Sequence, residues 1–261
     1  MSWTAILLAG QRPGVDPLAA HFGQEWKALV PVAGEAMLSR VARTLLACPS
    51  IGRIVVMAQE PKALFVGDCA WLADEPRIAT SVSHVGIATS VAEVAGSAAA
   101  PWPILLTTAD HPLLTPAMVE AAIAGVGDAD VGIGMVGRRT LLAAYPDNRR
   151  TWLKFAGEAW TGANLFALRT PAARRALLAW SAIEQDRKKA FRLIWHFGPL
   201  LALRAATRTI SLAGALAKAG AAVGVRAVPV PLPFAEAGID VDKPSDHVLA
   251  EAILTQRGLT A

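Results

Sequence analysis

The sequence predicts an α/β fold, a Rossmann-like three-layer sandwich in which helices cover both faces of a mostly parallel β-sheet. Short apolar segments of strand length alternate with segments whose apolar residues have helical spacing, the pattern of β-α-β units. Hydrophobic residues make up 54% of the chain but aromatic residues only 6%, which favours helices on a sheet over a β-sandwich. A length of 261 residues suits one large α/β domain or two small ones, with a substantial core.

The first half of the chain follows the alternating pattern. Its expected strands are residues 3–8, 54–58, 103–107 and 131–136, and its expected helices are residues 37–47, 87–98 and 118–124. Thr115 and Pro116 suit the N-cap and first turn of the last of these helices. Residues 9–34, rich in Gly, Pro and polar side chains, form a long connection of the kind that is usually functional.

The second half departs from this pattern. Its expected strands are residues 152–155, 165–168, 226–230 and 239–242. Its expected helices are residues 171–183 and 245–255, and residues 191–222 are expected to be largely helical. The segment 191–222 is strongly apolar, which fits either internal packing or a product bound for a lipid or envelope pathway.

Charge and cysteine content exclude several classes of protein. The net charge is +4 without a long basic run, so we expect no nucleic-acid partner. Cys48 and Cys69 form no CxxC pair, which argues against a disulfide framework or a zinc site and favours a cytoplasmic location. We expect neither a signal peptide nor a membrane-spanning helix. Short basic clusters either face solvent or attract phosphates; they are residues 138–139, 149–150, 174–175 and 187–189.

The first chemical motif follows the first expected strand. A glycine-containing turn at Gly10 can bring backbone N–H groups close to a phosphate, although Gly10 could equally serve only the turn. Downstream, Lys27 could be an ordinary edge charge. It could also place a cation on a triphosphate and offset the charge of a leaving pyrophosphate.

Carboxylates mark two further segments. Asp110 follows a buried strand, at the sheet edge where open α/β sheets bind ligands, although Asp is also a common N-cap or turn residue. Asp240 and Asp242 are two residues apart in an expected strand, so their side chains would point the same way and could share a metal. Asp246 fits the first turn of a helix, where negative charge is favoured.

These motifs resemble a known family. Leu8-Ala9-Gly10, followed by Lys27-Ala28-Leu29-Val30-Pro31-Val32-Ala33-Gly34 and a helix, resembles the molybdenum-cofactor-guanylyltransferase-like group of nucleotidyltransferases. The resemblance implies a GT-A type of Rossmann-like fold and Mg²⁺-dependent nucleotidyl transfer. It implies Asp110 as one metal ligand and Asp242, with Asp240 close behind, as the other. Gln11 departs from the family pattern by replacing a second glycine, and Trp26 departs from it by preceding Lys27 in place of Asp.

The resemblance also implies roles for individual residues. The implied catalytic residues are Lys27, Arg12 and Asp110, and the implied nucleotide-binding residues are Leu8, Ala9, Gly10, Gln11, Gly14, Lys27 and Ser90. Ser90 could instead be only a helix N-cap. Asn164 and Lys154 are the acceptor-side candidates, although Asn164 could equally satisfy local backbone in a turn.

We expect one domain, with a nucleotide-binding half at residues 1–136 and an acceptor-binding half at residues 137–261. The second half would carry a helical insertion at about residues 185–222. The expected partners are a nucleoside triphosphate, with CTP favoured, and a phosphorylated small alcohol or sugar, because the Asp240-Val241-Asp242-x-Pro244 ending resembles transferases for such acceptors. The oligomeric state is not predicted.

Three alternatives stay open at this point. The first is guanylyl transfer from GTP to molybdopterin or another phosphorylated cofactor precursor. The second is glycosyl transfer from a nucleotide sugar, which needs a mid-chain Asp-x-Asp, and Asp128 and Asp130 have that spacing. The third is a non-catalytic domain that binds an effector.

Overall fold

The computed structural model describes residues 1–84, 86–185 and 207–259. In this part of the chain an eight-stranded sheet has the order β10-β7-β9-β6-β1-β4-β5, with β8 paired to β9. Strand β9 is antiparallel to β6 and β7, and the pairs β1–β4, β1–β6, β4–β5 and β7–β10 are parallel. The predicted α/β fold with a mostly parallel sheet is therefore confirmed. The strands are β1 (Trp3–Leu8), β4 (Ile51–Ala58), β5 (Ile78–Val82), β6 (Ile104–Thr108), β7 (Val131–Gly137), β8 (Leu153–Lys154), β9 (Ala159–Leu168) and β10 (Ala227–Pro231).

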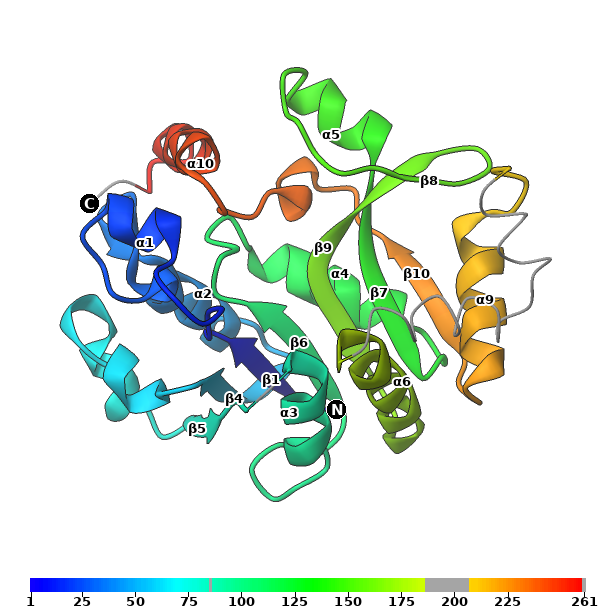
Figure 1. Cartoon of the computed structure of the whole chain (residues 1–261), viewed down its shortest axis with the longest axis horizontal. Helices are drawn as coiled ribbons and strands as arrows, with labels where there is room; N and C mark the ends of the chain where they lie inside the picture. The colour runs from blue at the N-terminus through cyan, green and yellow to red at the C-terminus, as the bar shows by residue number, and fades with distance from the viewer. Residues whose placement is uncertain (85, 186–206, 260–261) are drawn as a thin grey trace.

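Helices cover both faces of this sheet (Figure 1). Because successive strand residues point to opposite faces, strand β1 contributes to two cores. Its Ala5 and Leu7 belong to the core that contains residues of α2 (Met37–Leu46) and α4 (Pro116–Gly125). Its Ile6 belongs to the core that contains residues of α3 (Ile87–Val94) and α6 (Arg174–Gln185). The result is the expected three-layer arrangement.

A third apolar cluster joins the two ends of the chain. It combines residues of α1 (Pro17–His21) and α10 (Pro244–Gln256) with Val30, Leu113 and Val241, all buried. Between α1 and α2 lie a 3₁₀ turn, η1 (Lys27–Leu29), and a small hairpin of β2 (Pro31–Val32) and β3 (Glu35–Ala36). This cluster holds the N-terminal loop against the C-terminal acidic segment, so it positions the candidate site.

Several element predictions are confirmed and others are wrong. The expected strand 3–8 coincides with β1, and Thr115 caps α4 by accepting a hydrogen bond from Met118 N. The expected strand 239–242 is wrong. These residues follow the 3₁₀ helix η5 (Ala235–Gly238) and have no strand partner, and Val241 N instead donates to Asp110 O at 2.8 Å.

The expectations missed some short elements. Helix α1 lies inside the long connection, capped by Asp16, whose Oδ1 accepts from Leu18 N and Ala19 N at 3.0 Å. The sequence pattern also does not predict η1, β2, β3 and η5. The other elements without a prediction are β5, α5 (Arg138–Ala144), η2 (Pro61–Leu64) and η3 (Gly67–Ala73). Near the start of α6, the first residues of the expected helix 171–183 form the 3₁₀ turn η4 (Pro171–Ala173).

The expectation that residues 191–222 are largely helical can be compared with the structure only in part, because residues 191–206 lie outside the described residues. Residues 207–211 are not helical, and α9 (Leu212–Ala222) begins after Ser211, whose side chain accepts from Gly214 N at 3.1 Å. Within this segment, residues 212–222 are helical as expected and residues 207–211 are not. Among the helices that the structure describes, none is long and apolar enough to cross a membrane.

Candidate active site

The site lies where the strand order reverses. The chain passes from β1 to β4 and β5 on one side, and then returns to β6 on the other side of β1. In open α/β sheets the crevice beyond the carboxyl ends of the strands at such a switch point binds ligands. Gly10 follows β1 and Asp110 follows β6, and Ala109 N donates to Leu8 O at 2.8 Å, which fastens the two loops together. The Gly10 turn and Asp110 therefore lie side by side at the same edge of the sheet.

Lys27 lies between two carboxylates at this edge. Its Nζ is 2.6 Å from Asp110 Oδ2 and 2.5 Å from Asp242 Oδ1. The Lys27 side chain is 15% exposed and that of Asp110 22%, whereas that of Asp242 is 60% exposed. Burial opposes the charge on Lys27, but the two carboxylates outweigh burial and raise its pKa to about 12. The structure thus brings together three predicted residues from three distant segments.

Gln11 holds the Lys27 turn against the N-terminal loop. Its side-chain Oε1 accepts from Lys27 N at 3.0 Å, and its Nε2 donates to Glu25 O at 3.1 Å. The Gln59 amide fastens Gln11 in turn, since Gln59 Nε2 donates to Gln11 O at 2.7 Å and Oε1 accepts from Gln11 N at 3.2 Å. A Cβ on Gly10 would lie 2.8 Å from Gln59 Oε1, so Gly10 permits this close approach. Gln11, the residue that departs from the family pattern, therefore has the structural role of holding the Lys27 turn in place.

Asp242 is positioned by backbone contacts and by the third apolar cluster. The neighbouring residue Val241 is buried in that cluster and bonds through its N–H to Asp110 O at 2.8 Å. Asp242 N donates to Asp246 Oδ2 at 3.2 Å, and Asp246 lies in the first turn of α10, as predicted. These contacts hold the Asp242 carboxylate beside Lys27.

Asp240 lies in a different environment. It forms an ion pair with Arg150 through Oδ1, and Asn164 Nδ2 donates to its Oδ2 at 3.2 Å. Asn164 has a positive φ of 49° and lies where the β7–β9 register shifts, an irregularity that turns its amide toward Asp240. Asp240 and Asp242 therefore have separate cationic partners, Arg150 and Lys27.

The remaining predicted residues are more dispersed. Arg12 and Gly14 are exposed, and Lys154 is exposed on β8 in a separate cavity with Trp152 and Arg208. Ser90 is not an N-cap, because it lies inside α3, 2% exposed, with its Oγ donating to Gly86 O at 2.9 Å.

A carboxylate from α6 occupies the start of α3. Glu184 accepts from Ile87 N at 2.9 Å and from Ala88 N at 3.1 Å. The first two backbone N–H groups of α3, the helix that contains the predicted nucleotide-binding residue Ser90, therefore have a partner within the protein.

Lys27, Asp110 and Asp242 together form what we call the Lys27 cluster, and its carboxylates suit a hard divalent cation. Asp110 Oδ1 is buried and has no hydrogen-bond partner in the part of the chain that the structure describes. With Asp242 it offers two carboxylates, and Mg²⁺ commonly binds through one or two carboxylates while keeping several waters. Within residues 1–84, 86–185 and 207–259 no group of three or more His, Cys, Asp or Glu side chains forms a metal cage.

Two other titratable groups have structural surroundings. His111 is buried next to Asp110, its Nε2 lies 3.3 Å from Glu236 O, and burial lowers its pKa. Asp128 and Asp130 precede β7, at the opposite end of that strand from its carboxyl edge. Asp128 pairs with Arg226 at 3.0 Å, and Asp130 accepts from Thr170 Oγ1 at 2.6 Å.

Sequence pattern does not indicate two polar residues of the site, Gln59 and Arg150. Arg150 was one half of a basic pair with two open interpretations, and Gln59 carried no signal at all. The contacts of both cross at least 48 residues of sequence, so local pattern could not reveal them. For Arg150, the only signal in the sequence is that it belongs to the basic pair 149–150, one of the clusters that could attract phosphates.

The fold and the crevice define a Rossmann-like α/β protein with a lysine-carboxylate cluster at its switch point. The chain belongs to the MobA-like NTP transferase domain family, whose profile matches residues 5–192. No curated protein sequence matches significantly.

Solved structures agree with this assignment. A hypothetical transferase from Thermus thermophilus is 27% identical, with a TM-score of 0.76 over 95% of this chain and 100% of the other. Two more distant structures share the fold. A CMP:2-keto-3-deoxy-manno-octonic acid synthetase complexed with CTP is 17% identical, with a TM-score of 0.59 over 98% and 100% of the two chains. The 2-C-methyl-D-erythritol 4-phosphate cytidylyltransferase from Thermus thermophilus is 13% identical, with a TM-score of 0.52 over 98% and 100%.

Proposed function

We propose that this protein transfers a nucleoside monophosphate from a nucleoside triphosphate to a phosphorylated small alcohol or sugar and releases pyrophosphate. The observation that carries this proposal is the position of Lys27 between Asp110 and Asp242 at the switch point of the sheet. A cation and two carboxylates of the kind that can bind a metal, at a crevice beside a glycine turn, suit a polyphosphate substrate.

In the proposed reaction an acceptor phosphate oxygen attacks the α-phosphorus in line. A bond forms between that oxygen and the α-phosphorus, and the bond from the α-phosphorus to the bridging oxygen breaks, so pyrophosphate leaves with the electron pair. An acceptor phosphate is largely dianionic at neutral pH and needs no general base. The protein contributes positioning and charge: the Lys27 ammonium contacts a phosphate oxygen, and the backbone at Gly10 approaches the phosphates.

We propose Mg²⁺ as the cofactor, held by Asp110 and Asp242. When bound there it would neutralise phosphate charge. The Lys27 ammonium carries the same sign, so with substrate present it would contact phosphate oxygens in place of the two carboxylates. Asp240, already paired with Arg150, would then act by positioning the segment that carries Asp242.

CTP is the favoured nucleotide. Two of the similar structures are named for CMP or cytidylyl transfer, one of them with CTP bound, and this supports the choice that the Asp240-Val241-Asp242-x-Pro244 ending suggested. Guanylyl transfer from GTP to molybdopterin or a similar precursor is the second candidate, favoured by the matching family.

Glycosyl transfer receives less support from the geometry. Its Asp-x-Asp candidate, Asp128 and Asp130, lies at the amino end of β7 and is held by Arg226 and Thr170. The Lys27 cluster lies beyond the carboxyl ends of β1 and β6 instead. The same cluster argues for catalysis over effector binding alone, and the effector alternative predicts that its carboxylates are dispensable.

The test measures pyrophosphate release with each of the four NTPs, Mg²⁺ and a panel of phosphorylated acceptors. Asp110→Asn should reduce the rate by about 10²–10³-fold, the loss typical when one electrostatic group of an active site is removed. Asp128→Asn is the matched control, since it neutralises the rival motif and should leave the rate unchanged. Turnover of a UDP-sugar without pyrophosphate release from any NTP would refute the proposal.

A further inference from the structure

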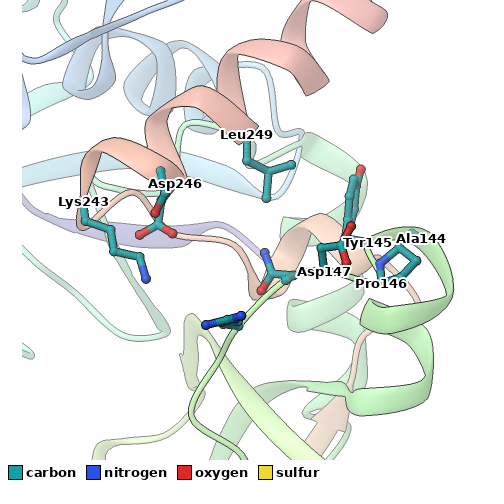
Figure 2. Close-up of a pocket in the computed structure, with 10 residues that line it drawn as sticks. Ala144, Tyr145, Pro146, Asp147, Lys243, Asp246 and Leu249 are labelled. Atoms are coloured by element: carbon teal, nitrogen blue, oxygen red, sulfur yellow. The ribbon is translucent and has the colours of Figure 1, made fainter.

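A cavity of about 400 Å³ opens beside the segment that carries Asp242. Figure 2 shows the lining residues on two sides of the cavity. Lys243, the N-cap of α10, lies on one side with Asp246 and Leu249 of that helix, and Tyr145, Pro146 and Asp147, from the loop that follows α5, lie on the other. Its volume lies within the roughly 300–1,000 Å³ typical of small-molecule sites. None of the residues predicted to bind the acceptor lines it, so the cavity is a site without an assigned ligand.

Two residues that line the cavity are the chain neighbours of Asp242 and of Arg150, the partner of Asp240. Lys243 directly follows Asp242, and Arg149 directly precedes Arg150, the ion-pair partner of Asp240. Both cationic residues of the cavity are exposed and therefore accessible to a ligand. A ligand bound between Lys243 and Arg149 would thus contact residues that directly adjoin Asp242 and Arg150 in the chain.

The polar groups of the cavity are suited to one anionic group and to hydroxyls. Two carboxylates line the cavity, those of Asp147 and Asp246. The Asp246 carboxylate already accepts a hydrogen bond from Asp242 N. Asn148 Oδ1 is buried and lacks a hydrogen-bond partner among the described residues. A buried amide oxygen without a partner is costly, and a ligand hydroxyl would satisfy it. Leu249 and Tyr145 supply apolar surface against a short carbon chain.

We propose that this cavity binds the acceptor, as a small polyol phosphate, through Arg149 and Lys243 at its phosphate and Asn148 at a hydroxyl. The proposal rests on the proposed nucleotidyl transfer and names the acceptor class and the residues that select it. The two cations would bind the nucleophilic phosphate at residues that adjoin Asp242 and Arg150 in the chain. The hydroxyl contact distinguishes a polyol phosphate from inorganic phosphate.

The kinetic test uses Arg149→Gln and Lys243→Gln with glycerol 3-phosphate, ribitol 5-phosphate and inositol 1-phosphate as probes. Each substitution should raise the acceptor KM about tenfold or more, because it removes a charge-assisted contact. The KM for the NTP should stay within about twofold. Exposed residues outside the cavity serve as matched controls: Arg139→Gln for the arginine and Lys62→Gln for the lysine.

A binding experiment separates this proposal from the proposed function. Titration calorimetry without NTP should show that at least one probe binds the wild type, binds about tenfold more weakly to each variant, and outcompetes inorganic phosphate. That result would support the cavity even if no pyrophosphate were released. Pyrophosphate release with an unchanged acceptor KM in both variants would overturn the cavity and keep the transferase. Failure of every probe to bind the wild type would also overturn it.

Discussion

The ammonium of Lys27 lies 2.6 Å from Asp110 Oδ2, although 83 residues separate the two in the chain. The same ammonium reaches Asp242, so it contacts both carboxylates that the proposed Mg²⁺ would use. An ammonium and a metal ion compete for the same carboxylates because both are cations. We infer that Lys27 occupies the cation position until a triphosphate offers it phosphate oxygens.

This competition predicts that Lys27→Ala binds a divalent ion more tightly than the wild type when no nucleotide is present. Removing the ammonium frees both carboxylates, and we expect an affinity for Mn²⁺ that is higher by about tenfold, or about 1.4 kcal/mol. Mn²⁺ binding can be followed by electron paramagnetic resonance. Lys62→Ala, at an exposed lysine of η2, should bind Mn²⁺ as the wild type does. Unchanged or weaker binding by Lys27→Ala would show that the ammonium and the metal do not share a position.

The separate environments of Asp240 and Asp242 predict different effects of neutralising each one. Asp242→Asn should lower kcat about 10²–10³-fold with little change in stability, since its side chain is 60% exposed. Asp240→Asn should lower the free energy of unfolding by about 2 kcal/mol, because it leaves the largely buried Arg150 without its ion-pair partner. Urea denaturation and pyrophosphate release measure the two effects. If Asp240→Asn lost metal binding while keeping full stability, Asp240 would be the ligand.

The bonds made by Gln11 predict that it positions Lys27 without touching the reacting groups. Gln11→Ala removes the bonds to Lys27 N and Glu25 O, and we expect the KM for the NTP to rise about five- to tenfold. Gln11→Glu keeps an acceptor for Lys27 N but loses the donor to Glu25 O, so it should recover part of that loss. Gln24→Ala, in the same connection, is the control. Equal KM values for Gln11→Ala and the wild type would remove the positioning role.

Local sequence pattern was sufficient for β1 and for the strand before Asp110, because buried parallel strands are short, continuous and apolar. The meeting of Lys27 with Asp242, 215 residues away, could be expected only through the resemblance to a family. The contacts of Gln59 and Arg150 could not be predicted from local pattern. Gln59 reaches Gln11 because β4 pairs with β1, and Arg150 reaches Asp240, which lies between Ile239 and Val241 of the third apolar cluster. The expected strand 239–242 failed because alternation of apolar and acidic residues predicts an extended chain but not a strand partner.

The environment of Glu236, the hydrogen-bond partner of the cavity residue Tyr145, predicts a pH-dependent contribution to stability. Its carboxylate accepts from Tyr145 Oη at 2.8 Å and lies 3.5 Å from Arg257. Burial alone would raise the pKa of Glu236, but its hydrogen bonds and Arg257 outweigh burial and lower it. A carboxyl group with a lowered folded-state pKa stabilises the protein above its unfolded pKa, about 4.3 for Glu, and loses that contribution as pH falls through the folded value.

Glu236→Gln should therefore be less stable than the wild type by about 1 kcal/mol at pH 7, a modest value because about a quarter of the side chain is exposed and screened by solvent. The difference should shrink as the pH falls below about 4, where the wild-type carboxylate also becomes protonated. Urea denaturation at pH 7, 5 and 3.5 measures it, with the exposed Glu60→Gln as the control. A difference that stayed constant across this range would mean that the charge of Glu236 does not contribute and that only the shape of its side chain matters.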